Sequence, residues 1–292
     1  RCAARMERAL RAITSKKWKP KTKSHRHNIF DKTDKMKKRR MHQLLLVLLI
    51  LMVNVNFING QYHKKLEEGF VQLFNGENFD GWHLKLKKGD SIMAKEVYAI
   101  EDGMVHVFKD MLDSLNLNTV ENATHGLFYT NKKYSKYILR FEYKWGEKIT
   151  NNFDEWQYDA GCYYHVFDDK VWPKGLEYQV RYNHITERNH TGDFWGAGVS
   201  LDWTATEDGK TFLLPKDGGK EMRNMKNEIY GYASPKYNAL NGKWNQCEII
   251  VMGNVYTIHK LNGEIVNMGT NLSVEEGIIG FQSETAEIFY RN

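Results

Sequence analysis

Cysteine and proline are scarce in this sequence. Of three cysteines among 292 residues, only Cys162 and Cys247 lie beyond residue 60, and there are four prolines. Two cysteines cannot form the network of disulfides that holds many small secreted domains together. Both lie in apolar strand patterns, so a single disulfide and two buried thiols are both open. The chain is long enough to bury a sizeable core without such a network.

Several familiar catalytic motifs are also absent. The sequence has no G-x-S-x-G nucleophile turn, no H-E-x-x-H helix, no phosphate-binding G-x-x-x-x-G-K-[ST] loop and no C-x-x-C zinc knuckle. No strand carries the E-x-D-x-x-E spacing with which sandwich-type retaining glucanases set two carboxylates close together. Conventional double-carboxylate hydrolysis of glycosides therefore has no obvious site here.

Positive charge is concentrated at the start of the chain. Residues 1–41 hold sixteen of the 42 Lys and Arg and three of the 36 Asp and Glu. The remainder has 26 basic and 33 acidic residues, a net charge of −7, although the whole chain carries +6. Nucleic-acid binding needs a basic face for the phosphates, so the acidic body argues against a nucleic-acid partner.

Residues 41–60 have the pattern of a secretory signal peptide. Four basic residues precede Met41, and an unbroken apolar run of ten residues, 44–53, leads to a polar exit that ends at Gly60. That run is short for a membrane span, which needs about 20 apolar residues. The pattern predicts cleavage near residues 60 and 61, a secreted or periplasmic protein, and no stable membrane span after cleavage. A retained N-terminal anchor is the alternative.

The basic residues 1–40 have no apolar pattern, which predicts disorder. A signal peptide does not normally carry such an upstream segment, so Met41 is expected to be the initiator. A tail that binds nucleic acid or a membrane surface is the alternative.

The sequence from residue 70 onward is typical of short strands separated by turns. Strands are predicted over 70–74, 98–100, 104–108 and 137–145, in a meander over 247–268, and over 277–282 and 287–290. Asp102-Gly103 and Asn262-Gly263 supply the positive φ that tight hairpins require. Long amphipathic helices are absent, so the pattern predicts an all-β, two-sheet sandwich or barrel in one domain over about 66–292. Weak periodicity predicts a long irregular loop region over about 184–237.

Two strands in the middle of the chain have a polar side. Side chains of a strand alternate between faces. In residues 159–167 an apolar set alternates with a polar and aromatic set, and residues 176–182 repeat the pattern. If the two strands are neighbours, one continuous face carries Asp159, Tyr163, His165, Glu177, Gln179 and Arg181. Sugar sites use such acids, amides and rings, but the open face of an antiparallel sheet is polar in any case, so both interpretations stay open.

A second group of candidates follows in the loop region. His190 and Asp193 flank a glycine turn, and the two side chains could point at one spot to act as acid and base or to bind a metal. A surface loop with an Asp-capped turn is the alternative that spacing alone favours.

Several phrases of the sequence resemble, in the right order, the 3-keto-disaccharide hydrolase domain family. They are G-F-V-Q-L-F-N-G-E-N-F-D-G-W at 69–82, Gly161 with its aromatic strand, G-L-E-Y-Q at 175–179, H-K-L-N-G at 259–263, and 277–292. They span nearly all of 69–292. The resemblance implies a concanavalin A-like jelly roll that bacteria export, acting on glycosides already oxidised at C3 of the sugar.

The resemblance also implies a chemistry that needs no carboxylate pair. A 3-keto group acidifies the C2 hydrogen, so a base can remove it, the C1 substituent leaves, and water adds afterwards. Such a site needs a base, a stabiliser for the enolate and aromatic platforms.

Glu177 and Gln179 lie on the family's E-Y-Q phrase, and strand facing and loop position supply the other site residues. His165 or His190 is the predicted base, and Glu177 and Asp193 are the predicted ligands of a divalent metal. The expected substrate-binding residues are Asp159, Tyr163, Gln179, Arg181, Trp156 and Trp195, with the rings of Tyr163, Trp156 and Trp195 as stacking platforms.

The predicted partner is a carbohydrate, an oxidised disaccharide or glycoside. A non-catalytic glycan-binding module on the same fold and a conventional glycosidase are the competing hypotheses. The choice between hydrolysis and net elimination stays open.

Overall fold

The structure, a computed structural model, describes residues 66–87, 91–110, 125–150, 155–237 and 240–292. The predictions for the basic segment 1–40 and the signal peptide 41–60 lie outside these residues. The chain divides into two compact units, Arg1–Phe70 and Val71–Asn292, and all that follows concerns the second. Among the described residues, no helix is long and apolar enough to cross a membrane.

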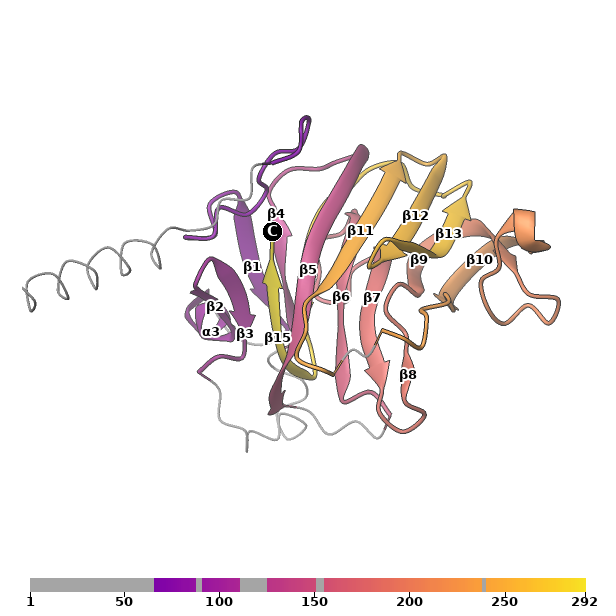
Figure 1. Cartoon of the computed structure of the whole chain (residues 1–292). Helices are drawn as coiled ribbons and strands as arrows, with labels where there is room; N and C mark the ends of the chain where they lie inside the picture. The colour runs from indigo at the N-terminus through magenta and orange to yellow at the C-terminus, as the bar shows by residue number, and fades with distance from the viewer. Residues whose placement is uncertain (1–65, 88–90, 111–124, 151–154, 238–239) are drawn as a thin grey trace, which may run out of the picture. The chain divides into compact units, whose positions relative to one another are not determined.

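The second unit is built almost entirely of antiparallel strands (Figure 1). One layer contains, in spatial order, β1 (Trp82–Leu86), β4 (Gly126–Thr130), β14 (Ile278–Ser283), β6 (Tyr158–Val166), β7 (Gly175–Asn183) and β9 (Phe194–Ala205). The path continues through β13 (Glu264–Thr270), β12 (Tyr256–Leu261), β11 (Asn245–Met252), β5 (Lys136–Ile149), β15 (Ala286–Arg291), β3 (Met104–Val107) and β2 (Tyr98–Glu101). β8 (Arg188–Asn189) pairs with β7, and β10 (Lys220–Ile229) with β9. The short helices are α3 (Ser91–Val97) and the 3-10 turn η2 (Pro215–Asp217).

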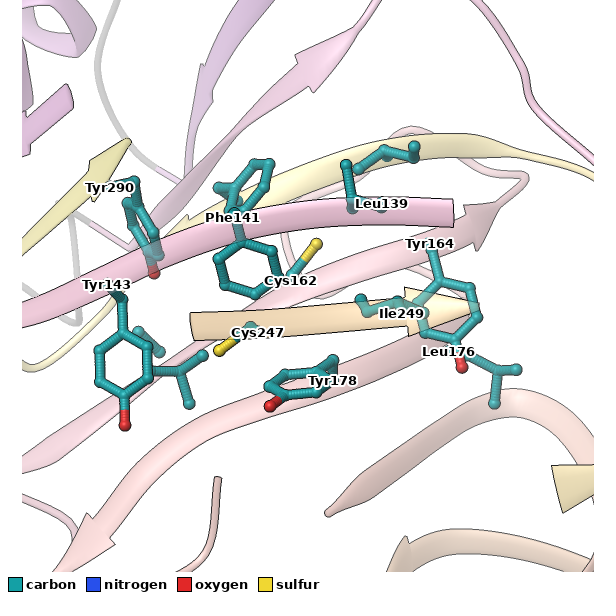
Figure 2. Packing of buried hydrophobic residues seen from close by; sticks show 14 of the residues in the cluster. Leu139, Phe141, Tyr143, Cys162, Tyr164, Leu176, Tyr178, Cys247, Ile249 and Tyr290 are labelled. Carbon is teal, nitrogen blue, oxygen red and sulfur yellow. The ribbon is translucent and has the colours of Figure 1, made fainter. Parts of the chain in front are cut away.

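The two halves of this path pack face to face around an aromatic core. The ring of Phe141 on β5 lies 5.0 Å from that of Phe281 on β14 and 5.8 Å from that of Tyr178 on β7. Figure 2 shows the side chains of Phe141 and Tyr178 in the space between the layers, with the thiols of Cys162 and Cys247 nearby. Both cysteines are buried and free. The prediction of an all-β, two-sheet sandwich is therefore confirmed, and of the two cysteine alternatives the structure has the buried thiols.

The hairpins form where the turn residues predict them. Asp102 and Gly103 join β2 to β3, and Asn262 and Gly263 join β12 to β13, each pair with two positive φ values between 49° and 86°. Two consecutive positive φ values match the twist of the flanking strands, which is why these dipeptides close tight hairpins. The predicted meander corresponds to β11, β12 and β13.

Two sequence predictions differ from the structure. The predicted strand 70–74 does not form, and β1 begins only at Trp82. The segment 184–237 is more regular than predicted, because it contains β9 and β10. The sequence of β10 shows no clear strand periodicity, for two reasons. Most of its residues are exposed, and register shifts accompany left-handed backbone conformations at Asn224 and Asn227.

Candidate functional site

The strands predicted to be neighbours, β6 and β7, pair side by side and align their polar residues in rows. Arg181 lies opposite Asp159, Gln179 opposite Gly161, and Glu177 opposite Tyr163. We call the residues of these three pairs the polar face. The alternation of the two strands thus brings together most of the predicted substrate-binding residues.

The neighbouring strands extend the rows on both sides. On β9, Trp195 pairs with Glu177. On β14, Gly280 pairs with Tyr163, and the same register brings Gln282 to the row of Gly161. At the end of β14, the Thr285 hydroxyl accepts the Asp159 N–H at 2.6 Å, which sets Glu284 beside Asp159. The rows of the polar face therefore continue onto β9 and β14 and end at a third carboxyl group, that of Glu284.

Gly161 provides the space for the carboxyl group of Glu177. A Cβ at position 161 would lie 1.9 Å from Glu177 Oε1. The side chain lies across the strand, buried, and Gln179 Nε2 donates a hydrogen bond to Glu177 Oε2 at 3.1 Å. Burial, and then the nearby Asp159, raises the pKa of Glu177 to about 8, against the lowering effect of Tyr163 and Arg181. At neutral pH this carboxyl group is mainly protonated, so it can donate a proton.

Several acids share the single guanidinium of Arg181. Burial raises the pKa of Asp159 to about 7, with Arg181 lowering it and Glu228 raising it further. Burial, together with Asp159 and Glu177, also raises the pKa of Glu284 well above its ordinary value. Carboxyl groups with raised pKa values that share one cation are a feature of acid–base sites.

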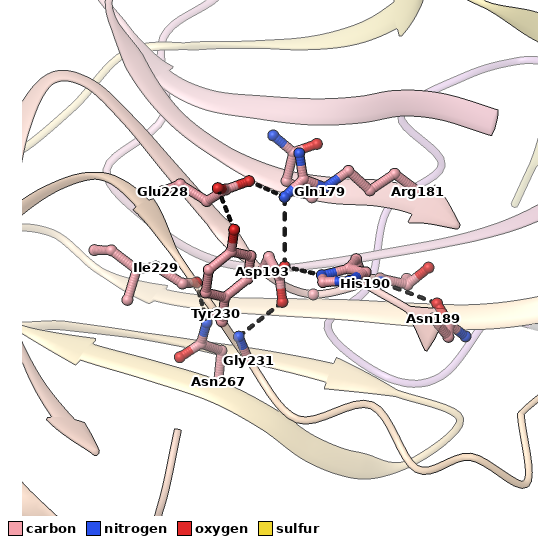
Figure 3. A network of polar contacts seen from close by, with 12 residues as sticks. Gln179, Arg181, Asn189, His190, Asp193, Glu228, Ile229, Tyr230, Gly231 and Asn267 are labelled. Atoms are coloured by element: carbon pink, nitrogen blue, oxygen red, sulfur yellow. Dashed lines mark hydrogen bonds and ion pairs between the residues drawn. The ribbon is translucent and has the colours of Figure 1, made fainter. Parts of the chain in front are cut away.

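His190 and Asp193 form a hydrogen-bonded pair beside this group (Figure 3). His190 Nδ1 and Asp193 Oδ2 are 2.8 Å apart, and both side chains are buried. The other carboxylate oxygen accepts the Gly231 N–H at 2.7 Å, and Arg181 Nη2 lies 3.7 Å from Oδ2. Because a carboxylate accepts from Nδ1–H, Nε2 of the neutral imidazole keeps the lone pair.

Aromatic rings enclose the imidazole and the guanidinium. The Trp156 ring lies 4.0 Å from the Arg181 guanidinium and 5.0 Å from the His190 ring. The Tyr230 ring lies 5.5 Å from His190 on another side, and its hydroxyl donates to Glu228, which is also an ion-pair partner of Arg181. These rings limit the access of water and strengthen the charged hydrogen bonds.

A histidine of the opposite layer holds the turn that carries this pair. His259 on β12 is fully buried and its Nδ1 donates to the carbonyl of Gly192 at 2.8 Å. Tyr164 Oη lies 3.0 Å from the Nε2 of the same ring, which can only accept once Nδ1 carries the proton. Burial lowers the pKa of His259 to about 3, so the ring is neutral. The position of His190 is thus supported across the core.

His165 lies away from the polar face, contrary to the prediction. A register shift between β6 and β14 marks a bulge, and His165 has a φ of 52°. Its Nε2 lies 3.1 Å from the carbonyl of Gly253, in the β11–β12 turn of the other layer. Because a bulge inserts one extra residue, the alternation counted from Asp159 fails after Tyr163.

Glu177 and Asp193 do not fit the predicted metal site. Both oxygens of Asp193 face N–H donors, and the Arg181 cation lies beside it. Within the described ranges, no group of three or more His, Cys, Asp and Glu side chains could hold a metal ion. Divalent cations need free carboxylate lone pairs.

Three residues of the site were missed from the sequence, namely Glu228, Tyr230 and Glu284. The alternation of β14 continues past Gln282 to Glu284, opposite the core residues Ile279 and Phe281, so this signal was present. This alternation identifies Glu284 as a residue of the site only when β14 is known to pair with β6. Nothing comparable marks Glu228, because β10 is polar along most of its length.

Comparison with known proteins gives one family match and several distant structural likenesses. The sequence profile of the 3-keto-alpha-glucoside-1,2-lyase-like domain matches residues 69–292. No curated protein matches the chain in sequence.

Three solved structures illustrate the likenesses. A protein provisionally described as a glycosyl hydrolase from Parabacteroides distasonis is 16% identical, covering 75% of this chain and 94% of that one, with a TM-score of 0.42. A carbohydrate-binding module from Bacillus subtilis is 12% identical over 73% and 92%, with a TM-score of 0.38. Porphyranase B from Zobellia galactanivorans is 9% identical over 73% and 84%, with a TM-score of 0.42.

Proposed function

The chain belongs to the 3-keto-alpha-glucoside-1,2-lyase-like domain family, and from this premise we propose that its polar face cleaves the glycosidic bond of 3-keto-glycosides by elimination. The observation that carries the proposal is an aspartate-held imidazole next to the Arg181 guanidinium, with the buried Glu177 carboxyl group on the same strand as that guanidinium. These residues supply a base, a cation and an acid, the set that removal of an acidic C–H requires.

We assign the base to His190. Its Nε2 takes the C2 proton, and the C–H electrons form the C2–C3 double bond while the C3 carbonyl oxygen becomes an enolate. Asp193 holds the imidazole in the required tautomer and stabilises the imidazolium that forms. Arg181, next to this pair, supplies positive charge for the enolate oxygen.

We assign the acid to Glu177. As the enolate collapses, the C1–O bond breaks, and the departing oxygen takes the proton of the Glu177 carboxyl group. The raised pKa keeps this proton in place at neutral pH. A water that later adds to the unsaturated sugar completes net hydrolysis, so elimination and hydrolysis differ only in this last step.

The residues that we assign to substrate binding lie on the polar face or at its edges. Asp159 and Gln179 offer acceptors and donors to sugar hydroxyls, and the partly buried rings of Trp156 and Trp195 border the face on two sides. Secretion or a periplasmic location agrees with a glycoside substrate and rests on the sequence pattern of residues 41–60.

The test is incubation of the purified protein with a matched glucoside and 3-keto-glucoside, with products read by mass spectrometry. We expect cleavage of the oxidised substrate only, and a product lighter by one water if elimination is not followed by hydration. His190→Ala and Glu177→Gln should each lower kcat by at least about 10²-fold.

His184→Ala is the matched control, because the ring of this partly exposed histidine is bonded, among the residues that the structure describes, only to the Glu155 carbonyl. Release from the unoxidised glucoside would instead identify a conventional glycosidase. Binding of both glucosides without cleavage would identify a glycan-binding module.

A further inference from the structure

Three buried polar atoms on the polar face and its continuation along β14 have no hydrogen-bond partner among the residues that the structure describes. They are Oε1 of Gln179, Oε1 of Gln282 and Nε of Arg181. The three side chains are 5%, 2% and 6% exposed. Buried polar atoms are almost always hydrogen-bonded, because leaving one without a partner is costly. Arg181 already has a role in the chemistry above, whereas Gln282 has none.

The neighbouring acids fix the orientation of both amide groups. Gln179 Nε2 donates to Glu177 Oε2 at 3.1 Å. The side chain of Gln282 hydrogen-bonds Glu284: burial raises the pKa of this acid, and the bond from Gln282 opposes the rise, as a bond from an N–H donor does. Each glutamine therefore turns its NH2 group toward an acid, and its amide oxygen remains as an acceptor.

The strand register places the two amides in one row of the sheet. Gln179 pairs with Gly161, and the pairing of β14 with β6 brings Gln282 to the other side of that glycine. Neighbouring strands are about 4.8 Å apart, so the two glutamine backbones are separated by roughly 10 Å. Gly161 places no side chain between them, and the space above it holds the Glu177 carboxyl group. The two acceptors thus flank the proposed acid.

Two acceptors in one row call for a ligand with two donors. An amide oxygen can pair with a hydroxyl group, which has a proton to donate, but not with an ether, ester or sulfate oxygen, which has none. A site built to pair with a hydroxyl group discriminates against the analogue without it, since a buried acceptor is then left unpaired. The row therefore suits a sugar whose hydroxyl groups are unsubstituted.

We propose that Gln282, together with Gln179, accepts hydrogen bonds from two hydroxyl groups of the oxidised sugar and thereby makes the site specific for them. The identity of the sugar rests on the proposed function. There the C3 oxygen lies at Arg181 and the C1 oxygen at Glu177, so the hydroxyl groups at C2, C4 and C6 are the available donors. Gln282 touches none of the reacting atoms and is a positioning residue.

The kinetic test pairs one protein change with one substrate change. It compares kcat/KM for methyl 3-keto-α-glucoside with kcat/KM for its three monodeoxy analogues, which lack the hydroxyl group at C2, C4 or C6. In the wild type at least one analogue should be about tenfold poorer, the loss of one hydrogen bond. This penalty should vanish in Gln282→Met, which has a side chain of similar length and no amide.

Gln246→Met is the matched control and should retain the penalty. Gln246 is an exposed glutamine of β11, in the other layer, and its Nε2 likewise donates to an acid, Glu142, at 3.2 Å. A wild type that cleaves all three analogues as well as the parent would overturn the proposal, whatever the fold of any variant. An undiminished penalty in Gln282→Met would overturn it as well.

A binding measurement keeps this proposal separable from the proposed function. Saturation-transfer NMR with unoxidised methyl α-glucoside should show contact with the protein that Gln282→Met weakens and Gln246→Met preserves. If the 3-keto-glucoside is not cleaved but this pattern is seen, the proposed function fails while the hydroxyl site stands. If the 3-keto-glucoside is not cleaved and the transfer is absent or equal in all three proteins, both fail.

Discussion

Replacing Gly161 with alanine adds one methyl carbon beneath the Glu177 carboxyl group. That carbon would lie 1.9 Å from Oε1 and 2.7 Å from the carboxyl carbon. The carboxyl group must therefore move by roughly 1.5 Å to reach an ordinary contact distance. The backbone of Gly161 is not in the left-handed region, so alanine adopts it without strain and the collision with Glu177 is the main effect.

The displaced carboxyl group loses its hydrogen bonds to Gln179 and Tyr163. A misplacement of about 1 Å of a catalytic group costs about 10²-fold in rate, so kcat on a 3-keto-glucoside should fall by about a hundredfold. The lost buried hydrogen bonds should lower the free energy of unfolding by about 1–3 kcal/mol.

A double-mutant cycle separates this reasoning from a general loss of fold. The assay measures kcat and urea unfolding for Gly161→Ala, Glu177→Ala and the double variant. Once Glu177 is shortened, the methyl group meets no carboxylate, so Gly161→Ala should then cost little in either quantity. Additive losses in the cycle, or a single Gly161→Ala variant with wild-type kcat, would refute the reasoning.

Three further predictions concern pH, the turn and metal. Burial gives Glu177 a pKa of about 8 and Asp159 a pKa of about 7 in the folded chain, above their ordinary 4.5 and 3.8, so the folded state binds more protons in this range. The contribution of these two groups to the free energy of unfolding should therefore be present in full near pH 4 and be lost as pH rises toward 8. The free energy of unfolding of the wild type should accordingly fall relative to that of Glu177→Gln as pH rises from about 5 to 8, which urea titrations at several pH values can check. His259→Ala should lower kcat about tenfold by freeing the Gly192 carbonyl, and His259→Asn, which keeps a donor, should recover part of it; equal kcat in the two variants would contradict this role. Prolonged dialysis against a chelator should leave kcat unchanged, and its loss with recovery on adding a divalent metal would show that our account of Asp193 is wrong.

Much of the fold could be predicted because its signals are local. The dipeptides Asp102-Gly103 and Asn262-Gly263 each fix a hairpin, since few residues adopt consecutive positive φ values. The alternation in β6 and β7 likewise set apart the core residues from Asp159, Glu177 and Arg181. Both signals depend only on neighbours in sequence.

The errors arose where structure depends on distant segments. The bulge at His165 exists because β6 must pair with β14 and closely approach Gly277, more than a hundred residues away, and alternation carries no mark of it. Glu284 and Glu228 reach the site through strand order, which turn residues do not encode. β10 was missed because an exposed edge strand has no apolar side to reveal its period.

The anchoring of the His190 turn has a consequence for how such a protein can diversify. The turn is tied to β7 through the bond from the Gly192 N–H to the Gln179 carbonyl, and to the other layer through His259 and the hydroxyl contact between Tyr143 and Thr191. A substitution that moves the proton-transfer groups must therefore disturb two layers at once. β10 is mostly exposed, as are Glu207, Asp208 and Lys210 of the turn after β9, so these residues can change one at a time. Selection can thus alter this margin while the His190 turn keeps its position.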